Sequence, residues 1–389
     1  MIILGIDTSC DDTCVSVIKI PNSKSKIQNF KILSNIVSSQ VKLHAKYGGV
    51  YPFLAKREHQ KNLPIAFKKA TKGTDISKTE LPFMEAKVKM RRKSSSPIDL
   101  VGITVGPGLE PCLWQGINFA KKLAEDLKLR IIPVNHIEAH ILANFIGEEI
   151  KNLKLKIKNY FPTICLVVSG GHTQLILMRG IGKYKILGET RDDAAGECFD
   201  KVARILGLGY PGGPIVAKMA AELKIKFGER CSSHASAKAS ANEKLKIKLP
   251  RPMMYTKDYD FSFSGLKTAV LYDFRSRPSK IRKSKEYIRE MCFETQQAII
   301  DVLIHKTLRA AKDFKVKSII LGGGVAANEE LRRQFKEKIQ KEILNTKYLI
   351  PDTEYCTDNA VMVAVTACFN QGKATTNWQK IKANANLKI

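Results

Sequence analysis

The chain has 389 residues, 44% of them hydrophobic, and a formal net charge of +28. This length predicts about two domains with substantial buried cores. The nine cysteines include no C-x-x-C pair, which excludes a disulfide framework and fits reduced thiols. The positive charge suits a polyanionic partner, nucleic acid first and an anionic membrane surface second, although a lysine-biased surface is the simpler reading.

The first half of the chain predicts alternating strands and helices. Residues 2–7 form an apolar strand that runs into a tight turn, 98–105 form a second strand, and 113–128 form a helix. The first seven residues reach an acid at Asp7 and lack a basic region, so we expect no signal peptide and a cytoplasmic protein.

The second half continues the same alternation. The uncharged run 161–178 contains Gly170 and Gly171, which predicts strand–turn–strand and not a membrane span. Helical patterns follow at residues 197–206, 214–224, 286–314 and 329–343. Residues 71–97 and 226–248 are rich in Lys and Ser and lack periodicity, so we expect two mobile surface insertions.

Three turns of glycine or small polar residues each follow an apolar strand. They come after residues 2–7, 164–168 and 319–321. Glycine allows a sharp turn and a close approach to a ligand, and the exposed N–H groups of such turns favour anions. Their recurrence in both halves of the chain predicts a duplicated nucleotide-binding fold.

Two histidines four residues apart, His136 and His140, offer a candidate metal site. On a helix both imidazoles lie on one face, where two neutral ring nitrogens can bind one divalent cation. A zinc peptidase of the H-E-x-x-H type carries Glu directly after the first His, whereas this chain has Ile137 there and Glu138 points elsewhere. The pair alone leaves core or surface histidines as the commoner interpretation.

The order of short motifs along the chain resembles the bacterial tRNA N6-adenosine threonylcarbamoyltransferase (TsaD) family nearly from end to end. The motifs that carry the resemblance are Gly5-Ile-Asp-Thr-Ser-Cys-Asp-Asp-Thr13, His44-Ala-Lys-Tyr-Gly-Gly-Val50, Arg57-Glu-His59, Val105-Gly-Pro-Gly-Leu109, Asn135-His-Ile-Glu-Ala-His140, Val168-Ser-Gly-Gly-His-Thr-Gln174, Asp192-Asp-Ala-Ala-Gly-Glu-Cys-Phe-Asp200, Tyr210-Pro-Gly-Gly-Pro214, Phe261-Ser-Phe-Ser-Gly-Leu-Lys267, Gly322-Gly-Gly-Val-Ala-Ala-Asn328 and Cys356-Thr-Asp-Asn359.

The resemblance implies an α/β fold of the ASKHA type (actin and sugar-kinase-like), with two related lobes around a nucleotide cleft. We expect residues 1–132 to form the first lobe, with 360–389 packing back on it, and residues 133–359 to form the second lobe with the metal and nucleotide sites. The implied reaction moves the threonylcarbamoyl group of threonylcarbamoyl-AMP to N6 of adenosine 37, in tRNAs that read codons beginning with A (t6A biosynthesis).

The resemblance also implies the site residues. His136, His140 and Asp358 correspond to the metal ligands of one divalent ion per subunit, with Fe²⁺ favoured and Zn²⁺ possible. The residues that correspond to substrate contacts are Val167, Val168, Ser169, Gly170, Gly171, Asp200, Gly213 and Asn328. In this assignment the N–H groups of residues 169–171 hold the phosphate, Asp200 binds a ribose hydroxyl and Asn328 reads the nucleoside.

A base for the N6 proton is not obvious from the sequence. Asp11, in the turn after the first strand, is our candidate, and a turn cap is the equally weighted alternative. His44, His59 and His172 are expected mainly to orient loops. The expected partners are tRNA, a TsaB-like paralogue and a TsaE-like ATPase, with no membrane. The competing functions are a metallopeptidase, an ASKHA-type ATPase or kinase, and a non-catalytic nucleic-acid binder.

Overall fold

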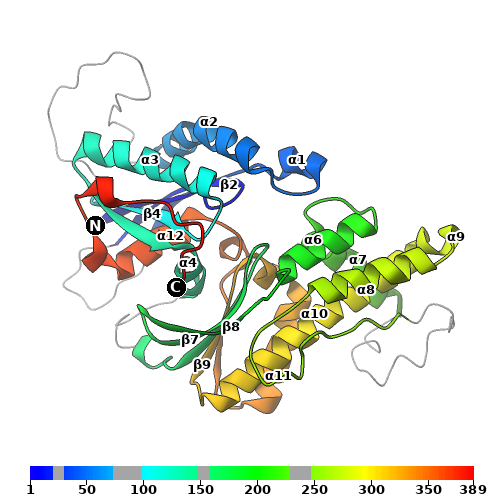
Figure 1. The fold of residues 1–389 in the computed structure, drawn as a ribbon. Helices are drawn as coiled ribbons and strands as arrows, with labels where there is room; N and C mark the ends of the chain where they lie inside the picture. The colour runs from blue at the N-terminus through cyan, green and yellow to red at the C-terminus, as the bar shows by residue number, and fades with distance from the viewer. Residues whose placement is uncertain (21–29, 73–97, 147–156, 228–246) are drawn as a thin grey trace. The chain divides into compact units, whose positions relative to one another are not determined.

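The computed structural model describes residues 1–20, 30–72, 98–146, 157–227 and 247–389 (Figure 1). The chain divides into two compact units. Unit 1 is Met1–Phe161, Gly180–Tyr184 and Leu349–Ile389, and unit 2 is Pro162–Arg179 and Lys185–Tyr348. In this division residues 133–161, 180–184 and 349–359 group with unit 1, whereas the sequence led us to expect them in the second lobe. Most of the two expected insertions, at residues 73–97 and 228–246, lies outside the described residues.

Unit 1 is built on a five-stranded sheet of order β3-β2-β1-β4-β5. Its strands are β1 (Ile2–Asp7), β2 (Asp12–Lys19), β3 (Lys31–Ser39), β4 (Leu100–Gly106) and β5 (Arg130–Asn135). Strands β1 to β3 pair antiparallel, whereas β4 and β5 continue the sheet parallel to β1. The mixture of directions is typical of an α/β fold whose parallel strands are joined by crossover helices.

Helices cover both faces of this sheet. The α-helices of unit 1 are α1 (Val41–His44), α2 (Pro52–Thr71), α3 (Glu110–Leu127), α4 (His136–Leu142) and α12 (Ala360–Phe369). Along β1 the side chains alternate: Leu4 and Ile6 join the core beneath α2 and α3, whereas Ile3 joins the core beneath α12 and α4. Unit 1 is therefore a three-layer α/β/α structure.

Helix α12 lies directly on the sheet because two strand positions have no side chain. A Cβ at Gly5 would lie 2.2 Å from the carbonyl oxygen of Ala360, and one at Gly102 would lie 2.8 Å from the Cβ of Ala367. Residues 360–367 of α12 are all buried. The glycines of β1 and β4 thus fix the depth at which the C-terminal helix sits, and with it the position of the residue before its N-cap, Asp358.

Unit 2 repeats the sheet of unit 1, in the order β10-β9-β6-β7-β8. Its strands are β6 (Thr163–Val168), β7 (Thr173–Gly180), β8 (Lys183–Glu189), β9 (Ser318–Gly322) and β10 (Lys347–Leu349). As in unit 1, the first strand pairs antiparallel with the next one, β7, and parallel with the first strand after the crossover, β9. The two equivalent sheets confirm the duplicated α/β fold expected from the sequence.

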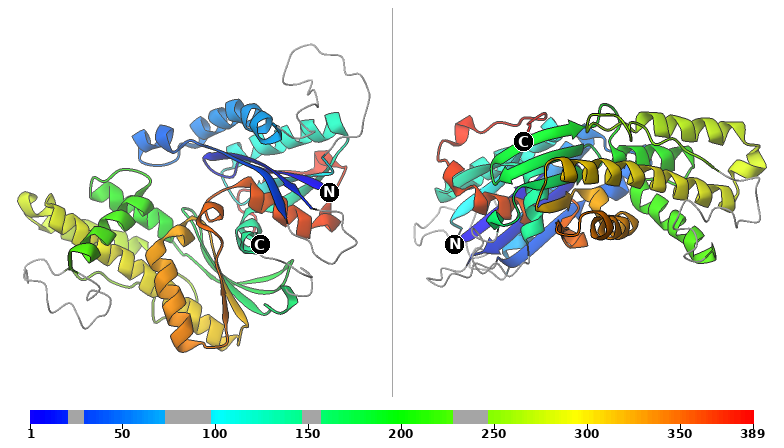
Figure 2. Two further views of the ribbon diagram at one scale, coloured as in Figure 1. Left: turned by 180° about the vertical axis from the view of Figure 1, so that it is seen from behind. Right: turned by 90° about the horizontal axis from the view of Figure 1, so that it is seen from below.

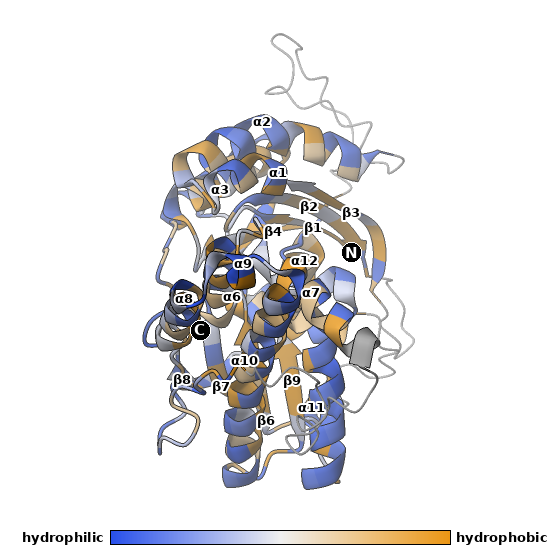
Figure 3. Cartoon of the chain, turned by 90° about the vertical axis from the view of Figure 1, so that its right-hand side faces the viewer, coloured by the Kyte–Doolittle hydropathy of each residue, from blue (hydrophilic) through white to orange (hydrophobic). Residues whose placement is uncertain are grey.

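The helices of unit 2 follow the predicted pattern closely. They are α6 (Ala195–Ile205), α7 (Gly212–Phe227), α8 (Ser264–Ser276), α9 (Ser279–Arg282), α10 (Lys285–Asp313) and α11 (Glu329–Glu342). The four helices predicted in this half are confirmed as α6, α7, α10 and α11, whereas α8 and α9 were not predicted. In Figure 3 strand β9 is largely orange, as a buried strand is expected to be, and α11 is largely blue.

The run 161–178 is confirmed as strand–turn–strand, since β6 and β7 flank the turn of Gly170 and Gly171. Among the described residues, no helix is long and apolar enough to cross a membrane. Two further views show the strands of each sheet side by side (Figure 2).

Candidate functional site

Helix α4 carries the two histidines, and its start is fixed by an asparagine cap. Asn135 ends β5, and its Oδ1 accepts hydrogen bonds from the N–H groups of Ile137 and Glu138. This cap satisfies donors that the first turn leaves without a partner. His136 therefore begins the helix at the carboxyl end of a strand, and His140 follows one turn later, as predicted.

The third candidate ligand, Asp358, lies far from the two histidines in the sequence. His136 Nε2 and His140 Nε2 lie 3.4 and 3.3 Å from the same oxygen, Oδ1 of Asp358. The two imidazole rings are 4.6 Å apart at an interplanar angle of 79°. Asn359 caps α12 by accepting from the N–H of Met362, so the residue before it is held at the helix entrance. The structure thus brings the three predicted metal ligands together within unit 1.

The chemistry of these side chains fits a bound cation. His140 is 1% exposed, and within the described structure its Nδ1 has no hydrogen-bond partner, while its Nε2 lies 3.3 Å from Asp358 Oδ1 without hydrogen-bond geometry. A buried, unsatisfied imidazole costs free energy unless another ligand completes it. One carboxylate and two imidazoles are a donor set that binds Fe²⁺ or Zn²⁺ and leaves positions open for a substrate.

The electrostatics of the site favour positive charge. Burial lowers the pKa of His136, but the carboxylates of Asp7 and Asp358 outweigh burial and raise this pKa to about 10. Burial lowers the pKa of His140, which lies beside His136. Burial raises the pKa of Asp358, but the two imidazoles hold it well below its usual range. The field at this point therefore attracts a proton or a metal cation.

The carboxylate of Asp7 contacts the ring nitrogen of His136 that does not face Asp358. Its Oδ2 lies 3.1 Å from His136 Nδ1, and its Oδ1 accepts from the N–H of Ser9. A carboxylate on the far ring nitrogen fixes the tautomer and makes the other nitrogen a stronger ligand. Ser9 reaches the site as well, because its Oγ lies 3.5 Å from Asp358 Oδ2.

Glu138, between the two histidines in sequence, points away from them as expected. Its Oε1 accepts from the hydroxyl of Tyr184, and its Oε2 accepts from the side-chain amide of Asn370. Glu138 is buried, so these two bonds compensate for its desolvation. This carboxylate ties α4 to its surroundings and is not positioned as a base for a metal-bound water.

Two neighbouring carboxylates of the same unit are Asp11, in the turn between β1 and β2, and Asp12, the first residue of β2. Oδ2 of Asp11 and Oδ1 of Asp12 are buried without a hydrogen-bond partner in the described structure. Burial raises the pKa of Asp11, and burial raises the pKa of Asp12 to about 7. A carboxyl group tuned upwards in this way is suited to accept a proton near neutral pH.

His44 and His59 hold loops, as the sequence led us to expect. His44 Nε2 bonds to Gln40 Oε1, and its Nδ1 accepts from the N–H of Tyr51. His59 Nε2 donates to the carbonyl of Cys10, and its Nδ1 pairs with the hydroxyl of Thr13. Both nitrogens of each ring are thus committed to neighbouring segments, and the carbonyl of Cys10 anchors the turn that carries Asp11.

In unit 2, the turn between β6 and β7 is open to a ligand. A Cβ at Gly170 or Gly171 would meet no atom within 4 Å. The Ser169 N–H, which was expected to hold a phosphate, donates to the carbonyl of His172 across the turn. The Ser169 side chain also belongs to the turn, since its Oγ accepts from the N–H of His172.

Two buried glycines bring other segments against this turn. A Cβ at Gly196, in the first turn of α6, would lie 2.6 Å from the Ser169 carbonyl oxygen. One at Gly323, whose φ is +89°, would lie 2.4 Å from the Val168 carbonyl oxygen. Only glycine permits these approaches. The β6–β7 turn, the start of α6 and the turn after β9 consequently meet at one place, and Val167 remains buried in β6.

The remaining predicted substrate contacts have structural tasks already. Asp200 Oδ1 accepts from the N–H of Gly212 at the start of α7, and Gly213 beside it has open space around its Cα. Asn328 caps α11 through its Oδ1 and donates from Nδ2 to Gln296. An Asn side chain offers two acceptor positions on Oδ1 and two donor positions on Nδ2, so Asn328 keeps one of each for a ligand as far as the described residues show.

The described chain is thus a duplicated α/β protein with a candidate mononuclear metal centre in one unit and an open Gly-rich turn in the other. The family model described as TsaD, tRNA N6-adenosine threonylcarbamoyltransferase, matches residues 31–365. The chain belongs to this family, as its motifs indicated.

Two curated relatives support the same membership, and both are named tRNA N6-adenosine threonylcarbamoyltransferase. The protein of Thermosipho africanus is 42% identical over 389 residues and covers all of both chains. That of Thermosipho melanesiensis is 44% identical over 365 residues, which are 94% of this chain and 93% of the relative. Among solved structures, T. kodakarensis HypF matches 96% of this chain and 48% of its own with a TM-score of 0.46 at 14% identity.

Proposed function

We propose that the chain is a tRNA N6-adenosine threonylcarbamoyltransferase that uses a divalent metal held by His136, His140 and Asp358. Family membership supports the transfer reaction. The convergence of two buried imidazoles on one carboxylate oxygen is the observation that carries the metal assignment. Fe²⁺ is the favoured ion, and Zn²⁺ suits the same ligands.

When bound, such an ion supplies Lewis-acid polarisation and orientation of the threonylcarbamoyl oxygens. The protein's contribution is to fix the ligand geometry. Asp7 orients His136, the Asn135 cap sets the start of α4, and the Asn359 cap sets the start of α12. Because all these groups are buried or capped, the site needs little rearrangement to bind substrate.

The reaction joins the adenosine N6 nitrogen to the carbonyl carbon of the threonylcarbamoyl group, while the bond from that carbon to the AMP phosphate oxygen breaks. AMP leaves as an anion, and N6 loses one proton. Asp11 is our candidate for the proton acceptor, since its Oδ2 has no partner in the described structure and its pKa is raised by burial. A base of this kind works by position and by a pKa near the working pH.

The nucleotide part of threonylcarbamoyl-AMP is assigned to the open turn of unit 2. The N–H groups of Gly170 and Gly171 are the phosphate donors in this assignment, because the Ser169 N–H is already engaged. Asp200, Gly213 and the free positions of Asn328 complete the contacts to ribose and base.

Exposed apolar side chains on unit 1 support the proposal of a TsaB-like paralogue as partner. Tyr47, Tyr51 and Phe53 are exposed at η1 (Ala45–Tyr47) and the start of α2, where the rings of the two tyrosines lie 6.0 Å apart, and Ile65 is exposed further along α2. Exposed large apolar side chains that cluster are typical of a protein–protein interface. The TsaE-like ATPase and the cytoplasmic location stay predictions from the family resemblance.

The competing functions have weaker support. A metallopeptidase needs a base beside a metal-bound water, and Glu138 is instead bonded to Tyr184 and Asn370. A kinase holds Mg²⁺ through oxygen ligands and phosphates and has little use for two imidazoles.

The test is transfer of the threonylcarbamoyl group, radiolabelled in its threonine part, from threonylcarbamoyl-AMP to unmodified tRNA by the purified chain with its expected partners. His136→Ala and Asp358→Ala are expected to lower the transfer rate by roughly a hundredfold or more. Glu125→Gln, an exposed acid on α3, is the matched control and is expected to act like the wild type. Full transfer by either site variant would show that the metal assignment is wrong.

A further inference from the structure

The end of unit 2 formed by α8, α9 and the start of α10 carries a dense positive charge. Six cations and no carboxylate occur from Phe274 to Lys285. In Figure 1, the short helix α9 lies at the outer end of the α8 and α10 pair, away from the strands of unit 2. We call residues 272–285 the basic tip.

The basic tip is held in place by contacts on its inner side. Asp273 accepts from Nε and Nη2 of Arg277 and from the hydroxyl of Tyr287. The guanidinium of Arg282 lies 5.3 Å from the centre of the Phe274 ring. Ser284 caps α10 by accepting from the N–H of Tyr287. The Asp273 carboxylate therefore holds Arg277 in place, and the Phe274 ring holds Arg282, which accounts for two of the six cations.

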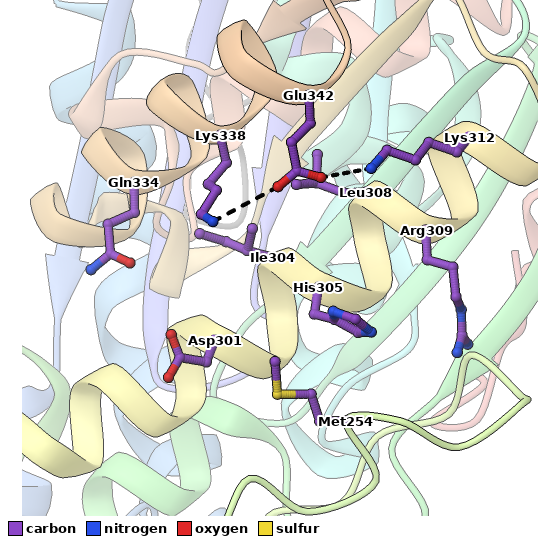
Figure 4. Close-up of a pocket in the computed structure, with 10 residues that line it drawn as sticks. All are labelled: Met254, Asp301, Ile304, His305, Leu308, Arg309, Lys312, Gln334, Lys338 and Glu342. Atoms are coloured by element: carbon purple, nitrogen blue, oxygen red, sulfur yellow. Dashed lines mark hydrogen bonds and ion pairs between the residues drawn. The ribbon is translucent and has the colours of Figure 1, made fainter. Parts of the chain in front are cut away.

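The other four cations face solvent. Arg275, Lys280, Lys283 and Lys285 are exposed, and none pairs with a carboxylate among the residues that the structure describes. Some exposed basic side chains elsewhere in unit 2 are matched, as Lys312 and Lys338 are by Glu342 (Figure 4), whereas others are unpaired but scattered along the sequence. Positive charges that lie close together without a carboxylate partner repel one another, and binding an anionic partner would relieve this repulsion.

Two exposed side chains interrupt the charge. Tyr272 is 66% exposed and lies one helical turn from Arg275, while Ile281 is 38% exposed. An aromatic ring among cations suits RNA, whose phosphates bind the cations and whose bases stack on rings. A membrane-binding surface needs a broad apolar face to insert, and one isoleucine does not provide it.

We propose that the basic tip is a docking surface for the sugar–phosphate backbone of the tRNA substrate. This inference rests on the proposed function for the identity of the RNA. The tip binds phosphates through Arg275, Lys280, Lys283 and Lys285, with Tyr272 against an exposed base or ribose. Asp273 acts as a positioning residue because it orients Arg277 and fixes the end of α8.

The experiment compares tRNA binding by two full-length variants that each lose four positive charges. The tip variant is R275Q/K280Q/K283Q/K285Q. The control is K185Q/K317Q/K336Q/K341Q, which removes four exposed lysines of unit 2 that are also unpaired among the described residues. Binding of fluorescent, unmodified tRNA is measured by anisotropy from 50 to 300 mM salt, with the expected partner proteins present.

We expect the tip variant to bind tRNA at least about tenfold more weakly, and its log–log salt slope to fall in magnitude by roughly 3, since each lost phosphate contact removes about 0.7 to 0.9. The control is expected to keep the wild-type slope to within about 1. K280R/K283R/K285R, which keeps the charge, is expected to bind as the wild type does. In the transfer assay, the tip variant should raise the KM for tRNA and leave kcat and threonylcarbamoyl-AMP binding unchanged.

Several results would overturn the inference. Equal tRNA binding by the tip variant and the control would do so, whether both are tight or both are weak. Binding of the wild type, but not the tip variant, to phosphatidylserine vesicles with unchanged tRNA binding would assign the tip to a membrane. A wild type that binds tRNA through the tip yet transfers no threonylcarbamoyl group contradicts the proposed function alone, so the two failures are distinguishable.

Discussion

Replacing Asp7 by asparagine tests how much the buried carboxylate behind His136 contributes to metal binding. Asn has the same shape and keeps an oxygen that can accept from the Ser9 N–H, so the turn is preserved. What it removes is the negative charge 3.1 Å from His136 Nδ1. Because His136 and Asp7 are both buried, solvent screens this charge only weakly.

The size of the effect follows from Coulomb's law. At an effective dielectric constant of about 20, two unit charges 3.1 Å apart interact by roughly 5 kcal/mol. A ligated imidazole carries only part of a unit positive charge, so about 2 kcal/mol is expected, or roughly a thirtyfold weaker metal affinity. This value lies within the tenfold to hundredfold range that is typical of such supporting carboxylates.

The assay is competition for Zn²⁺, and for Fe²⁺ without oxygen, between the purified protein and a chelating dye. Glu125→Gln is again the control, since it removes one negative charge from the exposed face of α3 in the same unit. An Asp7→Asn protein that binds metal within twofold of the wild type would refute this account of Asp7. His140→Ala should lose measurable binding altogether.

Three further predictions concern other parts of the chain. Burial and neighbouring carboxylates raise the pKa of Asp12 to about 7, so the native protein keeps a proton on Asp12 that the unfolded chain releases near pH 4, and the stability of the fold falls as pH rises between these values. In urea unfolding, Asp12→Asn should therefore be as stable as the wild type near pH 4 and more stable by up to about 4 kcal/mol above pH 7. A stability difference that does not change with pH would contradict this. Gly196→Ala should lower the melting temperature and lose threonylcarbamoyl-AMP binding in calorimetry, because its Cβ meets the Ser169 carbonyl, whereas Gly171→Ala, with open space around it, should leave the melting temperature unchanged. Equal melting temperatures for both variants would argue against the close contact between Gly196 and the β6–β7 turn. Lys306 is fully buried and donates to the hydroxyl of Thr256 and to the backbone carbonyls of Asp258 and Asp260. Lys306→Met should therefore lower the free energy of unfolding by about 3 kcal/mol. A loss below about 1 kcal/mol would show that these three acceptors find other partners in the variant.

Long periodic segments and glycine turns made much of this fold predictable. The helix expected at residues 286–314 is α10 within one residue at each end, because its cap Ser284 and its apolar repeat agree. The helix α2 (Pro52–Thr71) was not predicted, although Pro52 at its first position was a usable signal. Pro64 inside it and its weakly segregated polar face hide the pattern.

The candidate metal site and the β6–β7 turn could be predicted only in part from the sequence. Spacing placed His136 and His140 on one helix face, but Asp358 came from family resemblance, since no local pattern joins residues so far apart. The role of Asp7 depends on a hydrogen bond between the end of β1 and the first residue of α4, His136, and only the sheet order brings these two together. Likewise, the turn geometry alone shows that the Ser169 N–H is already engaged.

The fit of α12 onto Gly5 and Gly102 has a consequence for how the protein is made. A ribosome delivers both histidines before Asp358, so a nascent chain has a two-ligand site until α12 emerges and docks on the sheet. Full metal affinity is then a property only of chains in which α12 has docked. Loading with metal would mark the molecules in which the segments of α4 and α12 have already met.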